Sequence, residues 1–159
     1  MPAESDLILR TCESVVDFDL AIDLTRAYVQ WLGIDLAFQD IDTELAGFAE
    51  HYREPQGLFL LAFQQGRIAG GVGLRGFAPG VCEMKRLYVY PAFQRLGIGR
   101  RLCADIIAAA RQRDYRRMRL DTLGRLDAAL NLYRSFGFQE IEAYRYNPVA
   151  DVHYLELLL

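Results

Sequence analysis

The chain has 159 residues, of which 52% are hydrophobic and 25% are charged, a balance typical of a globular domain that buries a full core. Its net charge of −3 gives no electrostatic reason to expect nucleic acid as a partner. No apolar run approaches the ~18 residues of a membrane span, and Glu4 and Asp6 make the first ten residues unlike a signal peptide. Three scattered cysteines suggest neither a disulfide framework nor a metal site. We therefore expect a cytoplasmic protein with a single domain over residues 1–159.

Apolar periodicity and turn residues predict the elements in chain order. A short strand at 7–10 precedes two helices, at 17–32 and about 40–53. Three strands follow, at 58–63, 68–74 and 81–90, and then the clearest helix of the chain, at 97–114. A strand at 118–122, a helix at 126–136 and strands at 138–146 and 153–159 complete the order. This order predicts an α/β (α+β) fold with a mixed, mostly antiparallel sheet of six or seven strands flanked by helices. The strands at 81–90 and 118–122 should be parallel, joined by a right-handed crossover.

Two glycine-rich segments compete as candidate nucleotide-binding loops. Residues 71–76 match Gly-x-Gly-x-x-Gly, but a turn and another strand follow them where a dinucleotide site requires a helix. We interpret them as a strand of small residues that lets neighbouring groups approach closely. Residues 94–99, with the sequence Gln-Arg-Leu-Gly-Ile-Gly, instead lie between a strand and the start of the long helix. Helix N-termini bind anions through free N–H groups, so this second segment is the better phosphate site.

The form Gln-x-x-Gly-x-Gly resembles the cofactor loop of the GNAT superfamily of N-acetyltransferases. The segment 87–91, Leu-Tyr-Val-Tyr-Pro, resembles the family's central strand, and 132–138, Leu-Tyr-Arg-Ser-Phe-Gly-Phe, resembles its Leu-Tyr-x-x-x-Gly-Phe helix end. The resemblance implies a GNAT-like fold with a splayed central parallel pair. It also implies an enzyme, an acyltransferase that moves acetyl from acetyl-coenzyme A to a primary amine by direct attack. A non-catalytic acyl-coenzyme A-binding or sensor domain is the alternative.

The resemblance also assigns residues to the cofactor, and it implies no metal. The central strand would bind the thioester and the pantetheine arm through backbone N–H groups of Leu87, Tyr88 and Val89. The expected pyrophosphate loop comprises Gln94, Arg95, Leu96, Gly97, Ile98, Gly99 and Arg100. Thr122, Ala129 and Tyr133 are expected on the opposite wall of the cleft.

Two catalytic residues are predicted. Glu83 has a place on its strand similar to that of the glutamate base in the histone-acetylating branch of the family. Its alternative role is a structural ion pair, with Lys85 on the same face of the strand. Tyr133 stands where the family has its tyrosine general acid, and a phenol keeps its proton at neutral pH. Its alternative role is packing beneath the sheet.

The acceptor is less defined, and small-molecule and peptide amines both fit. The family pattern places it between the first helices and the last strands, where the candidate side chains are Tyr28, Trp31, Phe38, Tyr144, Tyr146, Asn147 and His153. Leu126 occupies a position where many members have a cofactor-contacting asparagine. An acyl-cysteine route through Cys82 or Cys103 is disfavoured because both look like buried core residues. The arginines of residues 111–119 are expected at the surface, with an acidic partner as the alternative. We expect neither nucleic acid nor membrane as a partner, while a homodimer stays open.

Overall fold

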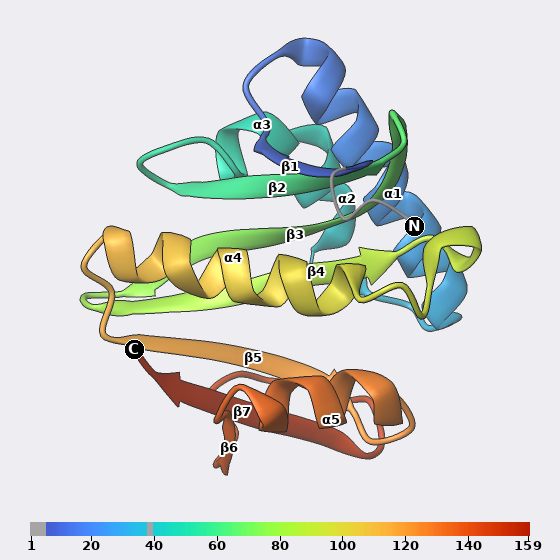
Figure 1. Ribbon diagram of the computed structural model, residues 1–159. Helices are drawn as coiled ribbons and strands as arrows, with labels where there is room; N and C mark the ends of the chain where they lie inside the picture. Colours follow the sequence, from blue (N-terminus) through green and yellow to red (C-terminus); the bar gives the residue numbers. More distant parts are fainter. Residues whose placement is uncertain (1–5, 38–39) are drawn as a thin grey trace.

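The computed structural model describes residues 6–37 and 40–159. Within these residues, seven strands form one sheet in the order β1-β2-β3-β4-β5-β7-β6 (Figure 1). The strands are β1 (Leu7–Thr11), β2 (Gly57–Gln64), β3 (Arg67–Ala78), β4 (Val81–Val89), β5 (Arg117–Leu123), β6 (Gln139–Ile141) and β7 (Val152–Leu158). All neighbouring pairs described are antiparallel except β4 and β5, which are parallel. The predicted mixed sheet with a central parallel pair is therefore confirmed.

Helices cover both faces of this sheet (Figure 1). One face carries α4 (Ile98–Gln112) and α5 (Asp127–Ser135), which pack on a core of apolar residues from β2 to β5 and β7. The other face carries α1 (Val15–Leu32), α2 (Ile41–Ala46) and α3 (Phe48–His51), and a second core there centres on Phe18, Phe48, Tyr52 and Phe59. The sheet is thus the middle layer of three.

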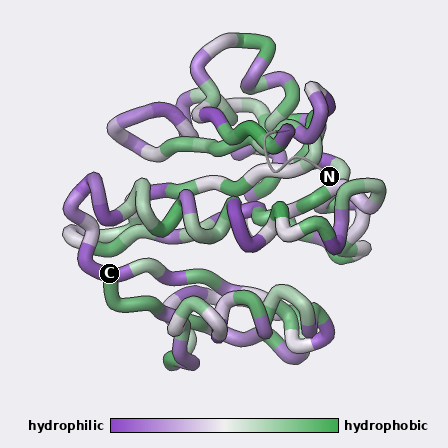
Figure 2. The backbone as a smooth tube through the Cα atoms, viewed as in Figure 1, coloured by the Kyte–Doolittle hydropathy of each residue, from purple (hydrophilic) through white to green (hydrophobic). Residues whose placement is uncertain are grey.

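Local sequence explains where the helices begin and end. Ser14 caps α1 through a reciprocal capping box with Asp17, and Gly33 ends the helix in the left-handed conformation. The helix predicted at about 40–53 is instead two short helices, because Gly47 interrupts it at φ −111°. Purple and green alternate along α4 in Figure 2, as expected for a helix with one face on the core.

The glycines of 71–76 lie inside β3 and open no helix, which confirms their interpretation as a strand. A Cβ on Gly73 would come within 2.6 Å of the Tyr52 ring, and one on Gly71 within 2.6 Å of Leu24. Both distances are shorter than real Cβ contacts allow. These glycines therefore let α1 and the aromatic core approach the middle of the sheet.

The strand predicted at 138–146 is shorter than expected. Only Gln139–Ile141 pairs with β7, and the chain from 142 to 151 forms the connection to β7. The reason is tertiary: Tyr144 and Arg145 turn their polar groups to Glu83 of β4 instead of continuing the ladder.

A β-bulge in β4 creates the irregularity that positions the site. Gly73 pairs with Lys85 and Gly71 pairs with Tyr88, so three steps on β4 oppose two on β3. Arg86, the extra residue, has a left-handed φ of 61°. Beyond the bulge β4 parts from β5, since the parallel ladder holds only Val81–Glu83 against Arg117–Arg119. The splayed pair is therefore opened by one residue inserted in the strand.

Candidate functional site

A cavity of about 490 Å³ occupies the opening between β4 and β5. Its walls come from the end of β4, the loop before α4, the end of β5 and the first turns of α5. Most residues that were expected to hold the cofactor line it: Leu87, Tyr88, Val89, Gln94, Arg95, Gly97, Ile98, Gly99, Thr122, Ala129 and Tyr133. Residues predicted from three separate sequence motifs therefore meet around one space.

Two residues of the predicted loop, Leu96 and Arg100, are not among those that line the cavity. The Leu96 side chain is 60% exposed. The Arg100 guanidinium donates to Ser135 Oγ at 3.1 Å and lies over the Phe136 ring at 5.3 Å, so it faces α5.

The loop itself has the geometry of an anion site. Gln94 donates from Nε2 to the Val89 carbonyl at 3.0 Å and thereby ties the loop to the end of β4. Gly97 is the N-cap of α4 with φ 80°, and it has no side chain to occupy the N–H groups of the first turn. Gly99 lies two residues further on, in the first turn of α4. A Cβ added there would have no neighbour closer than 3.8 Å. The positive end of α4, a 15-residue helix, therefore opens into the cavity.

Arg95 adds a formal positive charge beside these N–H groups. It lines the cavity and adopts φ 65°, a conformation that costs a non-glycine residue about 1 kcal/mol or more. Strain of this kind persists where the surrounding structure fixes the residue, and it often accompanies binding sites.

Residues 84–89 of β4 have no partner on β5 among the described residues. Leu87, Tyr88 and Val89 of this segment line the cavity. Unpaired N–H groups on this edge can donate to a carbonyl oxygen or an amide of a ligand that takes the place of the missing strand.

Tyr133 reaches the same space from α5. Its side chain is 7% exposed and packs edge-on against Phe138 at 5.8 Å. Burial raises the pKa of its hydroxyl well above the ordinary value, and Tyr28 adds to the effect. The phenol therefore keeps its proton throughout the physiological range and can serve as a donor. Both predicted features of Tyr133, core packing and access to the cleft, are present together.

Glu83 lies beside the site but not in the walls of the cavity. Its carboxylate, 4% exposed, accepts from the Tyr144 hydroxyl at 2.7 Å and from Arg145 at 2.9 Å. Lys85 Nζ lies 3.6 Å away. These contacts match the ion-paired role that the sequence left open, and they link β4 to the segment before β7.

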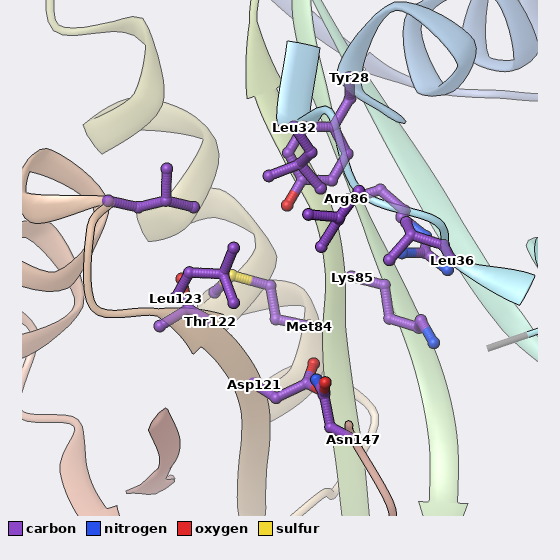
Figure 3. A pocket seen from close by; sticks show the side chains of 12 residues that line it. Tyr28, Leu32, Leu36, Met84, Lys85, Arg86, Asp121, Thr122, Leu123 and Asn147 are labelled. Carbon is purple, nitrogen blue, oxygen red and sulfur yellow. The ribbon is translucent and has the colours of Figure 1, made fainter. Parts of the chain in front are cut away.

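A second, smaller space of about 50 Å³ continues from the first (Figure 3). The two share Tyr28, Met84, Lys85, Arg86, Asp121, Thr122 and Leu126. In Figure 3, Asp121 and Asn147 lie side by side at one end, with Leu32 and Leu123 toward the other. Asn147 donates to Asp121 at 3.2 Å. Asp121 was not predicted as a site residue, although its place next to Thr122 at the end of a parallel strand could have suggested it.

Only some of the residues expected near the acceptor line the two cavities. Tyr28 and Trp31 line the larger cavity, and Asn147 lines the smaller one. Tyr144 binds Glu83, the Tyr146 side chain is 76% exposed, and His153 binds Glu140 at 2.6 Å on the outer strands. Phe38 lies outside the described residues. Leu126 lines both cavities, so an apolar surface takes the place of the amide seen in many family members.

The cysteines are poor nucleophiles. Burial raises the pKa of the Cys82 and Cys103 thiols to about 12, and both side chains are fully buried. At neutral pH almost no thiolate therefore exists on either residue, which makes both poor candidates for a covalent intermediate.

Metal ligands, membrane spans and the basic segment were the remaining candidate features. In the described part of the chain, no group of three or more His, Cys, Asp or Glu residues gathers in a way that could hold a metal ion. None of its helices combines the length and apolar character needed to cross a membrane. In the basic segment, Arg113 pairs with Glu54, and Arg117 and Arg119 both pair with Glu156.

Comparison with known proteins agrees with this geometry. Residues 23–138 match the family model described as the acetyltransferase (GNAT) family. The chain is 39% identical to an uncharacterized N-acetyltransferase of Schizosaccharomyces pombe, over 99% of this chain and 98% of that protein. An acetyltransferase from Streptococcus agalactiae has a similar structure, with a TM-score of 0.78, 21% identity and coverage of 97% and 99% of the two chains. A GNAT family acetyltransferase from Elizabethkingia anophelis, solved with acetyl-CoA bound, gives a TM-score of 0.69 at 21% identity over 98% and 100%.

Proposed function

The chain belongs to the acetyltransferase (GNAT) family, and on this premise we propose that its larger cavity binds acetyl-coenzyme A while the smaller one receives the primary amine to be acetylated. One observation carries the proposal. The bulged end of β4, the N-terminus of α4 and Tyr133 line a single cavity that opens into a second.

Each wall of the larger cavity suits one part of the donor. The pyrophosphate would bind at the N-terminus of α4, where Gly97 and Gly99 keep side chains away from the N–H groups and Arg95 adds charge. The pantetheine arm would run along the open edge of β4. In that position the thioester would lie between the bulge and Tyr133.

The reaction then needs no metal and no covalent enzyme intermediate. The amine nitrogen attacks the thioester carbonyl carbon, and N–H groups of the bulged strand stabilise the oxyanion. As the carbon–sulfur bond breaks, Tyr133 would donate its proton to the departing sulfur, and the proton that the acetylated nitrogen loses would return to the Tyr133 phenolate, directly or through water. The products are the acetamide and the free thiol of coenzyme A.

The amine must also lose a proton, because only roughly one alkyl amine in a few thousand is neutral at pH 7. Two carboxylates are candidates for the base. Glu83 is the one expected from sequence, and it would act through water because it does not line the cavity. Asp121 lines both spaces at their junction and is the candidate supported by position.

Three variants test these roles against a binding-only sensor. Acetyl-coenzyme A affinity is measured by calorimetry, and turnover by release of free thiol in the presence of a panel of amines. We expect Tyr133→Phe to bind acetyl-coenzyme A within threefold of wild type and to lose about 10²–10⁴ in kcat. The base is identified by comparing Glu83→Gln with Asp121→Asn in a plot of turnover rate against pH. The variant in which the rate no longer rises with pH is the one that lacks the base. Binding without turnover by the wild-type protein, whatever the amine, would instead support the sensor.

A further inference from the structure

The smaller cavity has features that select one class of amine. It is bounded by the segment after α1, the bulge of β4, the end of β5 and the connection before β7, and its side chains are drawn in Figure 3. Leu32, Leu36 and Leu123 belong to one buried apolar cluster, with Tyr28, Ile34 and Leu126 packed against it. An occupant therefore meets the edges of these apolar side chains, together with the polar groups that line the rest of the wall.

Both cations in this wall already have carboxylate partners. Arg86 binds Glu44 through Nε at 2.9 Å and a terminal nitrogen at 3.2 Å. Lys85 lies between Glu83 at 3.6 Å and Glu44 at 4.0 Å. An acceptor with its own carboxylate would have to compete with these buried ion pairs, which is costly.

Asp121, the acidic residue of this wall, differs from these two cations in its partners. Among the described residues Asp121 has no cationic partner within ion-pair distance, and its side chain accepts a hydrogen bond from the neutral amide of Asn147 at 3.2 Å. An ammonium group that arrives at the junction of the two cavities would supply the missing charge. A second ammonium group further along the same molecule would instead lie among leucines, with no carboxylate to receive it.

The size of the cavity limits the group that the amine can carry. A volume of about 50 Å³ holds roughly four water-sized groups. Short alkyl chains of about three to five carbons match this space, and a longer group would have to extend from it into the larger cavity or toward solvent.

Resting on the function proposed above, we propose that the acceptor is a short, apolar primary amine without a carboxylate and without a second ammonium group. Asp121 binds its ammonium end, and the pocket formed by Leu32, Leu36 and Leu123 takes its alkyl end.

Pairs of amines that differ by one group test this directly with the wild-type protein. 3-Methylbutylamine differs from leucine by the carboxylate alone, and pentylamine differs from 1,5-diaminopentane by the second amine. We expect kcat/KM to be at least tenfold higher for the first member of each pair. From ethylamine to butylamine it should rise roughly fourfold per methylene, the value of a buried CH₂ group.

Two variants link the preference to the pocket. With 3-methylbutylamine as the acceptor, Asp121→Asn should raise KM at least tenfold, while Asp127→Asn, an exposed carboxylate near the start of α5, leaves it unchanged. Leu123→Ala should move the preferred chain length up by one or two carbons. The amine pairs need no variant, so they decide the question even if Leu123→Ala fails to fold.

The outcomes separate this inference from the proposed function. Preference for leucine, for 1,5-diaminopentane or for a peptide with an N-terminal leucine overturns the assignment of the acceptor but leaves acetyl transfer intact. Failure to acetylate any amine, with acetyl-coenzyme A still bound, overturns the function and the inference together.

Discussion

The ion pair between Glu44 and Arg86 offers the sharpest test of how the fold holds the bulge. The two side chains are 4% and 5% exposed, and two hydrogen bonds of 2.9 and 3.2 Å join them. Burial alone would raise the pKa of Glu44, but the Arg86 guanidinium outweighs it and holds that pKa below the ordinary value. Arg86 also has the left-handed backbone that creates the bulge, so α2 and the central strand are joined at this point.

Replacing Glu44 by leucine would leave the Arg86 charge buried with its main carboxylate partner removed. Loss of one partner from a buried pair costs about 3–5 kcal/mol, whereas exchange of both partners for apolar residues is often neutral. We therefore expect Glu44→Leu to lower the melting temperature by roughly 6–20 °C in a chain of this length. The double variant Glu44→Leu/Arg86→Met should recover most of that loss.

Thermal and urea unfolding followed by circular dichroism measure the changes in melting temperature and in unfolding free energy, and the exposed pair Arg101–Asp105 is the matched control. Its nitrogen–oxygen distance is 3.2 Å, but its side chains are 51% and 38% exposed, so Asp105→Asn should cost less than about 1 kcal/mol. Because the Glu44 pKa is lowered, its contribution is complete above about pH 5 and fades as pH falls through the folded-state pKa. A loss for Glu44→Leu no larger than that of the control, or a double variant no better than the single, would refute the reasoning.

Three further outcomes are expected. Gly99→Ala should leave thermal stability unchanged, since its nearest neighbour would lie 3.8 Å away, yet raise the KM for acetyl-coenzyme A; equal affinity by calorimetry would argue against a phosphate at this turn. His153 has a raised pKa, chiefly through its hydrogen bond to Glu140, so His153→Gln should reduce stability below about pH 6.5. That difference should vanish as pH rises through the folded-state pKa, and its persistence at pH 9 in unfolding titrations would exclude the ion pair as its cause. Cys82→Ala and Cys103→Ala should retain wild-type kcat in thiol-release assays, whereas loss of turnover with normal folding would revive the acyl-cysteine route.

Sequence alone determined most of the fold because its signals are local. Apolar periodicity identified the strands and α4, and the position of a glycine pair between strand and helix separated the proposed phosphate loop from the similar glycines of β3. Tyr133 was found the same way, as part of a motif at a helix end. Gly97 and Gly99 were informative because the function proposed for them depends on the main chain and not on a side chain.

Tertiary structure decided the parts that depend on partners distant in sequence. The Glu83 side chain is directed to Tyr144 and Arg145, 61 and 62 residues away, and this contact also ends β6 early. Asp121 gains its importance only because Asn147 and the leucines of the α1 end surround it. Local patterns report which face of an element is buried, but they do not reveal which charges will be paired once the elements pack. For that reason the residues proposed to bind the donor could be predicted from the sequence, whereas those proposed to bind the acceptor were found only in the fold.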